Sequence, residues 1–171
     1  AMDMGDRGQI LSCDVHPYKV KLIESGAQRL GLTSIRAAAA DAREKHAVWE
    51  GQADVVMADV PCSGLGIIRK KPDIRYKNPK ELAQLPLVQR AILENASGYV
   101  RPGGTLVYST CSILPQENED VTGDFLDKHP EFEPVRTAFP LPVGPCPGQV
   151  TLWPQRHGTD GFYICRMRRK D

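Results

Sequence analysis

The chain has 171 residues, of which 41% are hydrophobic and 25% charged, a composition typical of one globular domain with its own core. Its 22 basic and 21 acidic residues leave a net charge of +1, so bulk charge neither favours nor excludes a nucleic-acid partner. No apolar run is long enough to span a membrane, and the first residues lack the pattern of a signal peptide. We therefore expect a cytoplasmic protein with no membrane partner.

The first part of the chain predicts a strand, a helix and two further strands. An apolar run over 9–14 ends in an acid, and Pro17 then suits the first turn of a helix that ends at Gly31. A second strand is expected over 34–38. The compact apolar run over 53–59 is the clearest strand pattern in the sequence.

The rest of the chain alternates between loops, helices and strands. The expected elements are the basic loop 64–79, the helix 82–99, the turn 102–104, the strand 105–109, the helix 116–128, the loop 134–154 and the strand 162–168. Strands that alternate with helices predict an α/β fold with a doubly wound, mostly parallel sheet. Such sheets bind ligands at the carboxyl ends of their strands.

Two acids follow early strands and are candidates for nucleotide binding. Asp14 ends the first strand, where a carboxylate can accept hydrogen bonds from ribose hydroxyls, and Asp41 follows the second strand, where it could receive an adenine amino group. Both positions are also typical of acids that stabilise the start of a helix. Taken alone, Asp14 favours the helix interpretation, and Asp41 is weak evidence for either.

Five cysteines are scattered along the chain: Cys13, Cys62, Cys111, Cys146 and Cys165. An odd number without Cys-x-x-Cys or Cys/His spacing fits neither a disulfide framework nor a zinc site, so we expect reduced thiols and no metal. Cys62 follows the strand that ends in Asp59 and enters a glycine-containing loop. Cys111 follows a later strand and precedes a helix expected near Pro115, a position that lowers a thiol pKa and suits a nucleophile.

An inert buried thiol is the alternative for each cysteine. Two thiols at separate strand ends of one sheet disfavour that alternative. The segments that carry them are Asp59-Val60-Pro61-Cys62-Ser63-Gly64 and Tyr108-Ser109-Thr110-Cys111-Ser112.

Together, these two segments resemble the paired cysteine motifs of the RNA cytosine-C5 methyltransferase family, and of its Sun/RsmB type most closely. Further agreement covers essentially the whole chain: Arg69-Lys70-Lys71-Pro72-Asp73-Ile74-Arg75, Arg101-Pro102-Gly103-Gly104, Pro115-Gln116-Glu117-Asn118-Glu119 and His157-Gly158-Thr159-Asp160-Gly161-Phe162-Tyr163. The resemblance implies a class I, Rossmann-like methyltransferase sheet, S-adenosyl-L-methionine as cofactor and RNA as partner, with ribosomal RNA favoured. The later Thr-Cys-Ser favours the RNA class over the DNA class.

The resemblance also implies a role for each site residue. Cys111 would add to cytosine C6 so that C5 can attack the methyl group, Cys62 would assist product release, and Asp59 would lie between cofactor and base. Asp14 would hold the ribose of the cofactor, and Asp41 its adenine. The target base must leave its stack, and basic residues of the loop would hold the phosphates around it: Arg69, Lys70, Lys71 and Arg75. A second basic cluster, over 166–170, is expected to be solvated surface.

The glycine-rich cofactor loop of this family is missing from the sequence, and so is the usual N-terminal RNA-binding domain. We therefore expect residues 1–171 to be a truncated catalytic domain that lacks the first, central strand of its sheet and has little activity alone. Exposed sheet edges could then promote oligomerisation. Two alternatives remain open: a non-catalytic RNA-binding domain that keeps the scaffold, and a redox-sensing protein that uses Cys62 and Cys111.

Overall fold

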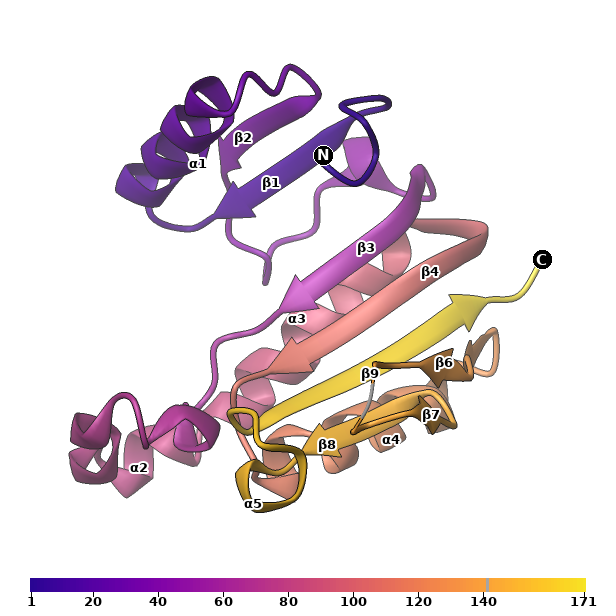
Figure 1. Cartoon of the computed structure of the whole chain (residues 1–171). Coiled ribbons are helices and arrows are strands. Elements are labelled where there is room, and N and C mark those ends of the chain that lie inside the picture. Colours follow the sequence, from indigo (N-terminus) through magenta and orange to yellow (C-terminus); the bar gives the residue numbers. More distant parts are fainter. Residues whose placement is uncertain (141) are drawn as a thin grey trace. The chain divides into compact units, whose positions relative to one another are not determined.

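The computed structural model describes residues 1–140 and 142–171, and the chain divides into two units, 1–45 and 46–171. The first unit consists of β1 (Ile10–Asp14), α1 (Pro17–Arg29) and β2 (Ile35–Ala39). The two strands pair in parallel along their whole length, and α1 connects them (Figure 1). All three elements lie where the sequence predicts them, within one or two residues.

A larger sheet forms the second unit. β3 (Ala53–Asp59) and β4 (Val100–Thr110) pair in parallel, and β9 (Phe162–Arg169) lies antiparallel on the other side of β4. The strand order is β3-β4-β9-β5, with β5 spanning Phe132–Pro134, and β8 (Gln149–Leu152) also pairs with β9 (Figure 1). The fold is therefore α/β and Rossmann-like, as predicted, with its parallel pairs at β1–β2 and β3–β4 and antiparallel strands added towards the C-terminus.

Helices connect and cover these strands. The α-helices are α2 (Pro79–Leu82), α3 (Leu85–Tyr99), α4 (Glu119–Lys128) and α5 (Pro154–His157). Short 3₁₀ helices are η1 (Ala47–Trp49), η2 (Leu65–Ile67), η3 (Pro72–Tyr76) and η4 (Pro115–Glu117). A small hairpin pairs β6 (Thr137–Ala138) with β7 (Pro145–Cys146). Among the described residues, none of the helices has the length and apolar character needed to cross a bilayer.

Several predicted boundaries differ from the structure, and the helix predicted over 116–128 begins only at Glu119, after η4. The turn expected at 102–104 lies inside β4, where the pairing with β3 shifts register between Ala53 and Val55 and Gly103 takes a positive φ of 73°. A separate short helix, α2, ends at Leu82 before α3 begins. The loop predicted over 134–154 contains β8, because pairing with β9 fixes a segment whose proline and glycine content indicates a loop.

The core of the second unit lies between the sheet and the helices α3 and α4. Its most buried side chains come from β4, α4 and β9, and seven of them have no exposed surface: Val100, Leu106, Tyr108, Val121, Tyr163, Cys165 and Met167. This packing fixes β3 and β4 side by side, so their carboxyl ends emerge at one edge of the sheet.

Candidate active site

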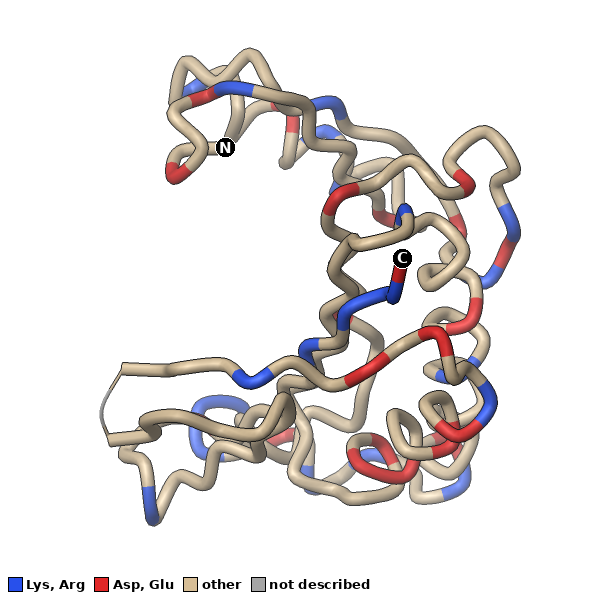
Figure 2. Tube along the Cα trace, turned by 90° about the vertical axis from the view of Figure 1, so that its right-hand side faces the viewer, with Lys and Arg blue, Asp and Glu red and all other residues tan. Residues whose placement is uncertain are grey.

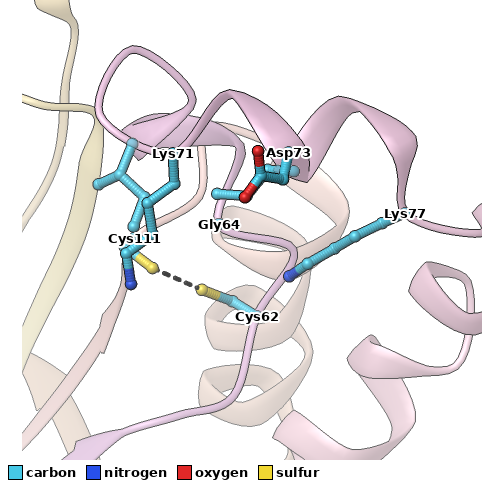
Figure 3. A pocket seen from close by; sticks show the side chains of 8 residues that line it. Cys62, Gly64, Lys71, Asp73, Lys77 and Cys111 are labelled. Carbon is cyan, nitrogen blue, oxygen red and sulfur yellow. Dashed lines mark hydrogen bonds between the residues drawn. The ribbon is translucent and has the colours of Figure 1, made fainter.

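The two predicted cysteines meet at the carboxyl ends of β3 and β4. These strands are parallel neighbours, with Asp59 opposite Ser109 at their last paired position. Each strand is followed within a few residues by its cysteine, and the Sγ atoms of Cys62 and Cys111 lie 3.2 Å apart (Figure 3). The Asp59 side chain accepts a hydrogen bond from Ser109 Oγ at 3.0 Å, on the same edge.

A cavity of about 520 Å³ opens beside the two sulfurs. Its wall is formed by the two cysteines and by residues of the loop after Cys62: Gly64, Ile67, Lys71, Asp73, Ile74 and Lys77. Figure 3 shows the Lys77 side chain extending toward Cys62, and its Nζ donates to Ser63 O at 2.9 Å. The volume lies within the range that small-molecule sites occupy and can accommodate a planar base.

The two thiols are chemically unequal. The hydrogen bond from Cys62 lowers the pKa of Cys111 to about 7, with a smaller contribution from Lys77, against the opposing effects of burial and Asp59. Donating that hydrogen bond, together with burial, raises the pKa of Cys62 far above its usual range. Above about pH 7, the negative charge of the pair is therefore carried by Cys111, and Cys62 keeps its proton. The sequence predicted a lowered pKa from a helix N-terminus, whereas its main cause here is the second cysteine.

Glycines hold three loops in close contact around the thiols. Gly66 N donates to Cys111 O at 3.0 Å, and Gly161 N donates to Gly66 O at 2.8 Å. A Cβ atom on Gly66 would overlap Gly161 O, and one on Gly161 would lie 2.6 Å from Ile113 Cγ2. The segment before β9 is thus packed against both cysteine loops.

A family model described as 16S rRNA methyltransferase RsmB/F matches residues 1–168. The chain belongs to this family. It is 44% identical to the probable ribosomal RNA small subunit methyltransferase B of Bacillus subtilis, over 98% of this chain and 39% of that protein. It is 34% identical to ribosomal RNA small subunit methyltransferase F of Salmonella paratyphi A, over 99% of this chain and 36% of that protein.

A solved structure of NSun6 from Pyrococcus horikoshii with SFG is also similar. It has a TM-score of 0.81 at 26% identity, over 100% of this chain and 44% of that one. The RsmB/F chain therefore spans less than half the length of these relatives.

In this RsmB/F chain, the four basic residues predicted to bind RNA have different surroundings. Lys70 Nζ and Arg69 bind the carboxylate of Asp160, at 2.6 Å and 3.4 Å. Lys71 lines the cavity, and the Arg75 guanidinium lies 4.9 Å from the centre of the Tyr76 ring. Asp160 lies in the segment 157–163 that resembles the family, and the sequence did not predict it as a partner of the basic loop.

The two acids predicted to hold the cofactor belong to the first unit of the RsmB/F chain. Asp14 accepts from His16 N at 2.9 Å and from Lys19 Nζ at 3.2 Å. Asp41 accepts from the backbone N and the side chain of Arg43, and the hydrogen bonds from that side chain are the main reason its pKa falls to about 2. Both carboxylates are therefore charged and partly occupied by local donors.

The basic cluster over 166–170 makes local contacts. Arg169 donates to Val100 O at 2.6 Å, Lys170 Nζ donates to Pro130 O at 2.7 Å, and Arg168 pairs with Asp171 at 3.6 Å. Figure 2 shows these basic residues as blue segments on the trace that leads to the C-terminus. Their contacts favour a structural role at the end of β9.

Proposed function

We propose that this domain transfers a methyl group from S-adenosyl-L-methionine to C5 of a cytosine in RNA, with small-subunit ribosomal RNA as the substrate class. The observation that carries the proposal is the pair of sulfurs at 3.2 Å, with a lowered pKa on Cys111. Membership of the RsmB/F family and the names of the curated relatives support the choice of ribosomal RNA.

Cytosine C5 is too weak a nucleophile to take a methyl group unaided, and Cys111 overcomes this. Its thiolate adds to C6, forming an S–C6 bond and moving an electron pair onto C5. When bound, S-adenosyl-L-methionine supplies the methyl group that C5 attacks. A base then removes the C5 proton, and the electrons of that C–H bond restore the C5=C6 double bond, which breaks the S–C6 bond and releases the Cys111 thiolate.

Cys62 suits the release step. Its thiol keeps a proton within hydrogen-bond distance of the Cys111 sulfur, so it can stabilise that sulfur as negative charge returns to it. Asp59, on the neighbouring strand end, would face the target base and cofactor. Lys71 and Lys77 line the same cavity and would attract the phosphates of a flipped nucleotide.

The residues of the first unit fit part of the cofactor. Asp14 accepts two hydrogen bonds in the structure, and an ionised carboxylate can accept about four, which leaves capacity for ribose hydroxyls. Asp41 fits less well, because the Arg43 side chain contacts both of its oxygens and would have to move before an adenine amino group could bind. We therefore propose Asp14 for the ribose, and Asp41 for the adenine only once the Arg43 side chain has moved. A cytoplasmic location stays a prediction.

Two cysteine variants test this function in the complete gene product that contains these residues, with RNA and cofactor supplied. Cys111→Ser should abolish methylation and leave RNA affinity nearly unchanged. Cys62→Ala should accumulate a covalent protein–RNA adduct, visible as a shifted band on a denaturing gel, because release is impaired.

Methylation that persists in Cys111→Ser would contradict the proposal. RNA binding without any methylation in the unsubstituted protein would favour the non-catalytic alternative. Bisulfite mapping of ribosomal RNA from cells that lack the gene would identify the modified cytosine.

A further inference from the structure

A buried carboxyl group lies behind the thiol pair and takes no part in the chemistry above. The side chain of Glu117, in η4, is 1% exposed. Its Oε2 accepts from Ser63 N at 2.8 Å and from Gln89 Nε2 at 3.2 Å. Its Oε1 is buried and has no hydrogen-bond partner among the described residues. Burying a carboxyl group with an unused oxygen is costly, which suggests a specific task.

Glu117 and Gln89 form hydrogen bonds to the two residues that flank Cys62 in the chain, Ser63 and Pro61. Gln89, from α3, is fully buried, and its Nε2 also donates to Pro61 O at 2.9 Å. The residue before the cysteine is thus bound through its carbonyl and the residue after it through its amide. These two contacts leave the Cys62 backbone little freedom to move relative to η4.

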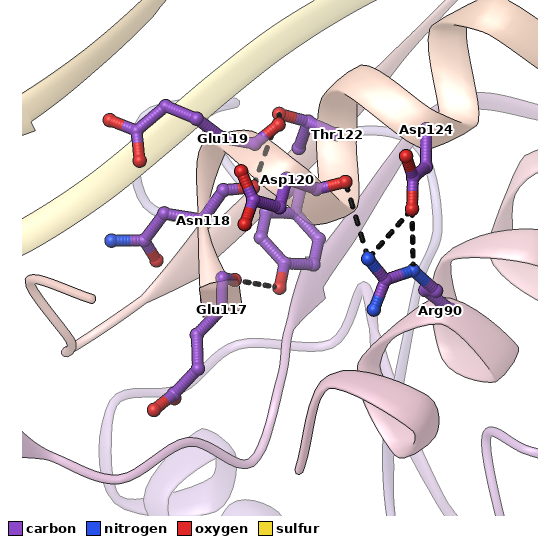
Figure 4. Close-up of polar contacts among 8 residues, drawn as sticks. Arg90, Glu117, Asn118, Glu119, Asp120, Thr122 and Asp124 are labelled. Carbon is purple, nitrogen blue, oxygen red and sulfur yellow. Dashed lines mark hydrogen bonds and ion pairs between the residues drawn. The ribbon is translucent and has the colours of Figure 1, made fainter. Parts of the chain in front are cut away.

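Asn118, the next residue in the chain, holds both neighbours of Cys111. Its Oδ1 accepts from Thr110 Oγ1 at 2.6 Å, and its Nδ2 donates to Ser112 O at 3.1 Å. Figure 4 shows the Glu117 and Asn118 side chains pointing in different directions from the same turn. Two adjacent residues therefore connect the two cysteine loops.

The connecting turn is itself anchored to the core. Tyr108, in β4, has no exposed surface, and its hydroxyl donates to Glu117 O at 2.6 Å. A direct contact between the loops, Ser63 Oγ to Ser112 Oγ at 3.0 Å, adds to the connection. Apart from the part-buried contact of Gln89 with Pro61 O, the hydrogen bonds that connect the two cysteine loops are buried, so water does not compete for them.

We propose that Glu117 is a positioning residue that sets the separation of the Cys62 and Cys111 sulfurs by holding the Cys62 loop against η4. Its importance for methylation rests on the proposed function of the two thiols. The positioning itself can be measured without RNA or cofactor. Glu117→Ala leaves the buried Ser63 N–H without its acceptor and frees the loop, whereas Glu117→Gln keeps an acceptor oxygen at the same place.

Phenylarsine oxide reports whether the Cys62 and Cys111 sulfurs are close enough to be bridged. It condenses with two adjacent thiols, forms two As–S bonds and releases its oxygen as water. Binding is followed by intact mass and by competition with a dithiol, and Cys62→Ala gives the background from the other cysteines. Glu117→Ala should bind about tenfold more weakly than the unsubstituted chain, and Glu117→Gln within about twofold of it. Glu119→Ala is the matched control, since Glu119 bonds Thr151 Oγ1 and neither cysteine loop.

The pH profile of Cys111 alkylation is a second readout that a purely structural role would not change. The midpoint is expected at about pH 7 in the unsubstituted chain. It should rise in Glu117→Ala, because the hydrogen bond from Cys62 to Cys111 is lost in this variant. It should stay at about 7 in Glu119→Ala, which keeps that hydrogen bond. If Glu117→Ala does not fold in thermal melts, Gln89→Leu replaces it, since this variant removes the donor to Pro61 O and Glu117.

If Glu117→Ala and the unsubstituted chain bind phenylarsine oxide equally tightly, the positioning role is overturned. A loss of affinity for phenylarsine oxide in Glu117→Gln as large as that in Glu117→Ala would also overturn it. If the dithiol readouts change as expected but Cys111→Ser still methylates RNA, the proposed function fails and the positioning role stands.

Discussion

At the scale of single residues, the proposed chemistry depends on the contact between the two sulfurs. Cys62 and Cys111 are the same residue type at equivalent strand ends, yet the 3.2 Å contact raises the pKa of one and lowers that of the other. The thiolate is the reactive form of cysteine, so this inequality supports the proposed attack by Cys111. Small displacements of either loop should therefore change reactivity more than stability.

Gly66 is the residue where one added methyl group should disturb the site most. Its Cβ would overlap Gly161 O and lie 2.9 Å from Cys111 O, and both are backbone atoms that cannot rotate away. We expect Gly66→Ala to lower the free energy of unfolding by about 1–3 kcal/mol. Urea denaturation measures the change.

Gly123→Ala is the control for that substitution. Gly123 lies within α4, and a Cβ there meets nothing within 4 Å, so alanine should raise the free energy of unfolding by about 0.5–1 kcal/mol. If the two alanine variants were equally stable, the close contact of the three loops would not be the constraint that the structure indicates.

At the scale of elements, a histidine links α3 to the end of α4. His129 Nε2 lies 2.9 Å from Glu94 in α3, its Nδ1 lies 3.0 Å from Glu131, and its ring stacks on Phe125. Burial alone would lower the pKa of His129, but the hydrogen bonds to Glu131 and Glu94 outweigh it and raise the pKa. The protonated ring therefore favours the folded chain.

This contact makes stability depend on pH in a defined direction. Because the folded pKa is raised, the contribution is fully present below the unfolded pKa of about 6.5 and is lost as pH rises through the folded pKa. We expect His129→Gln to lower the melting temperature more at pH 5.5 than at pH 8.5. An equal loss at both pH values would show that only packing on Phe125 matters.

At the scale of the whole molecule, the chain spans about two fifths of the length of its Bacillus subtilis relative. Within the described residues, one edge of the larger sheet is unpaired. β3 is the first strand in that sheet, and within the described residues nothing pairs with its outer side. Val55 and Met57 lie two residues apart on one face of β3 and are 60% and 70% exposed. Apolar side chains on an edge strand favour association.

We therefore predict that the isolated chain self-associates through β3. Met57→Lys should shift sedimentation toward the monomer, because a charge on an edge strand opposes pairing. Leu87→Lys is the control, since Leu87 is 63% exposed in α3, outside the sheet. Association that responds equally to both substitutions would indicate a contact not centred on β3.

Much of this arrangement follows from local sequence patterns. The compact apolar runs of β1 and β3, the helix that begins at Pro17, and the acid or thiol after each strand could be predicted, because strand periodicity and proline geometry act over a few residues. The two cysteine segments likewise indicated the family. Parallel strands bring their carboxyl ends to one edge, so even the meeting of Cys62 and Cys111 could be expected.

Only the tertiary structure decided which groups act on those residues. β8 forms because β9 pairs with it, although the surrounding stretch 134–154 is rich in proline and glycine. Lys70 and Arg69 form ion pairs with Asp160, some ninety positions away in the sequence. Glu117 accepts a hydrogen bond from the backbone amide of Ser63. Such contacts depend on distances between segments that are remote in sequence, which periodicity and spacing do not encode. The sequence by itself determined the chemical groups at the strand ends, and the packing of the loops decided their hydrogen bonds and pKa values.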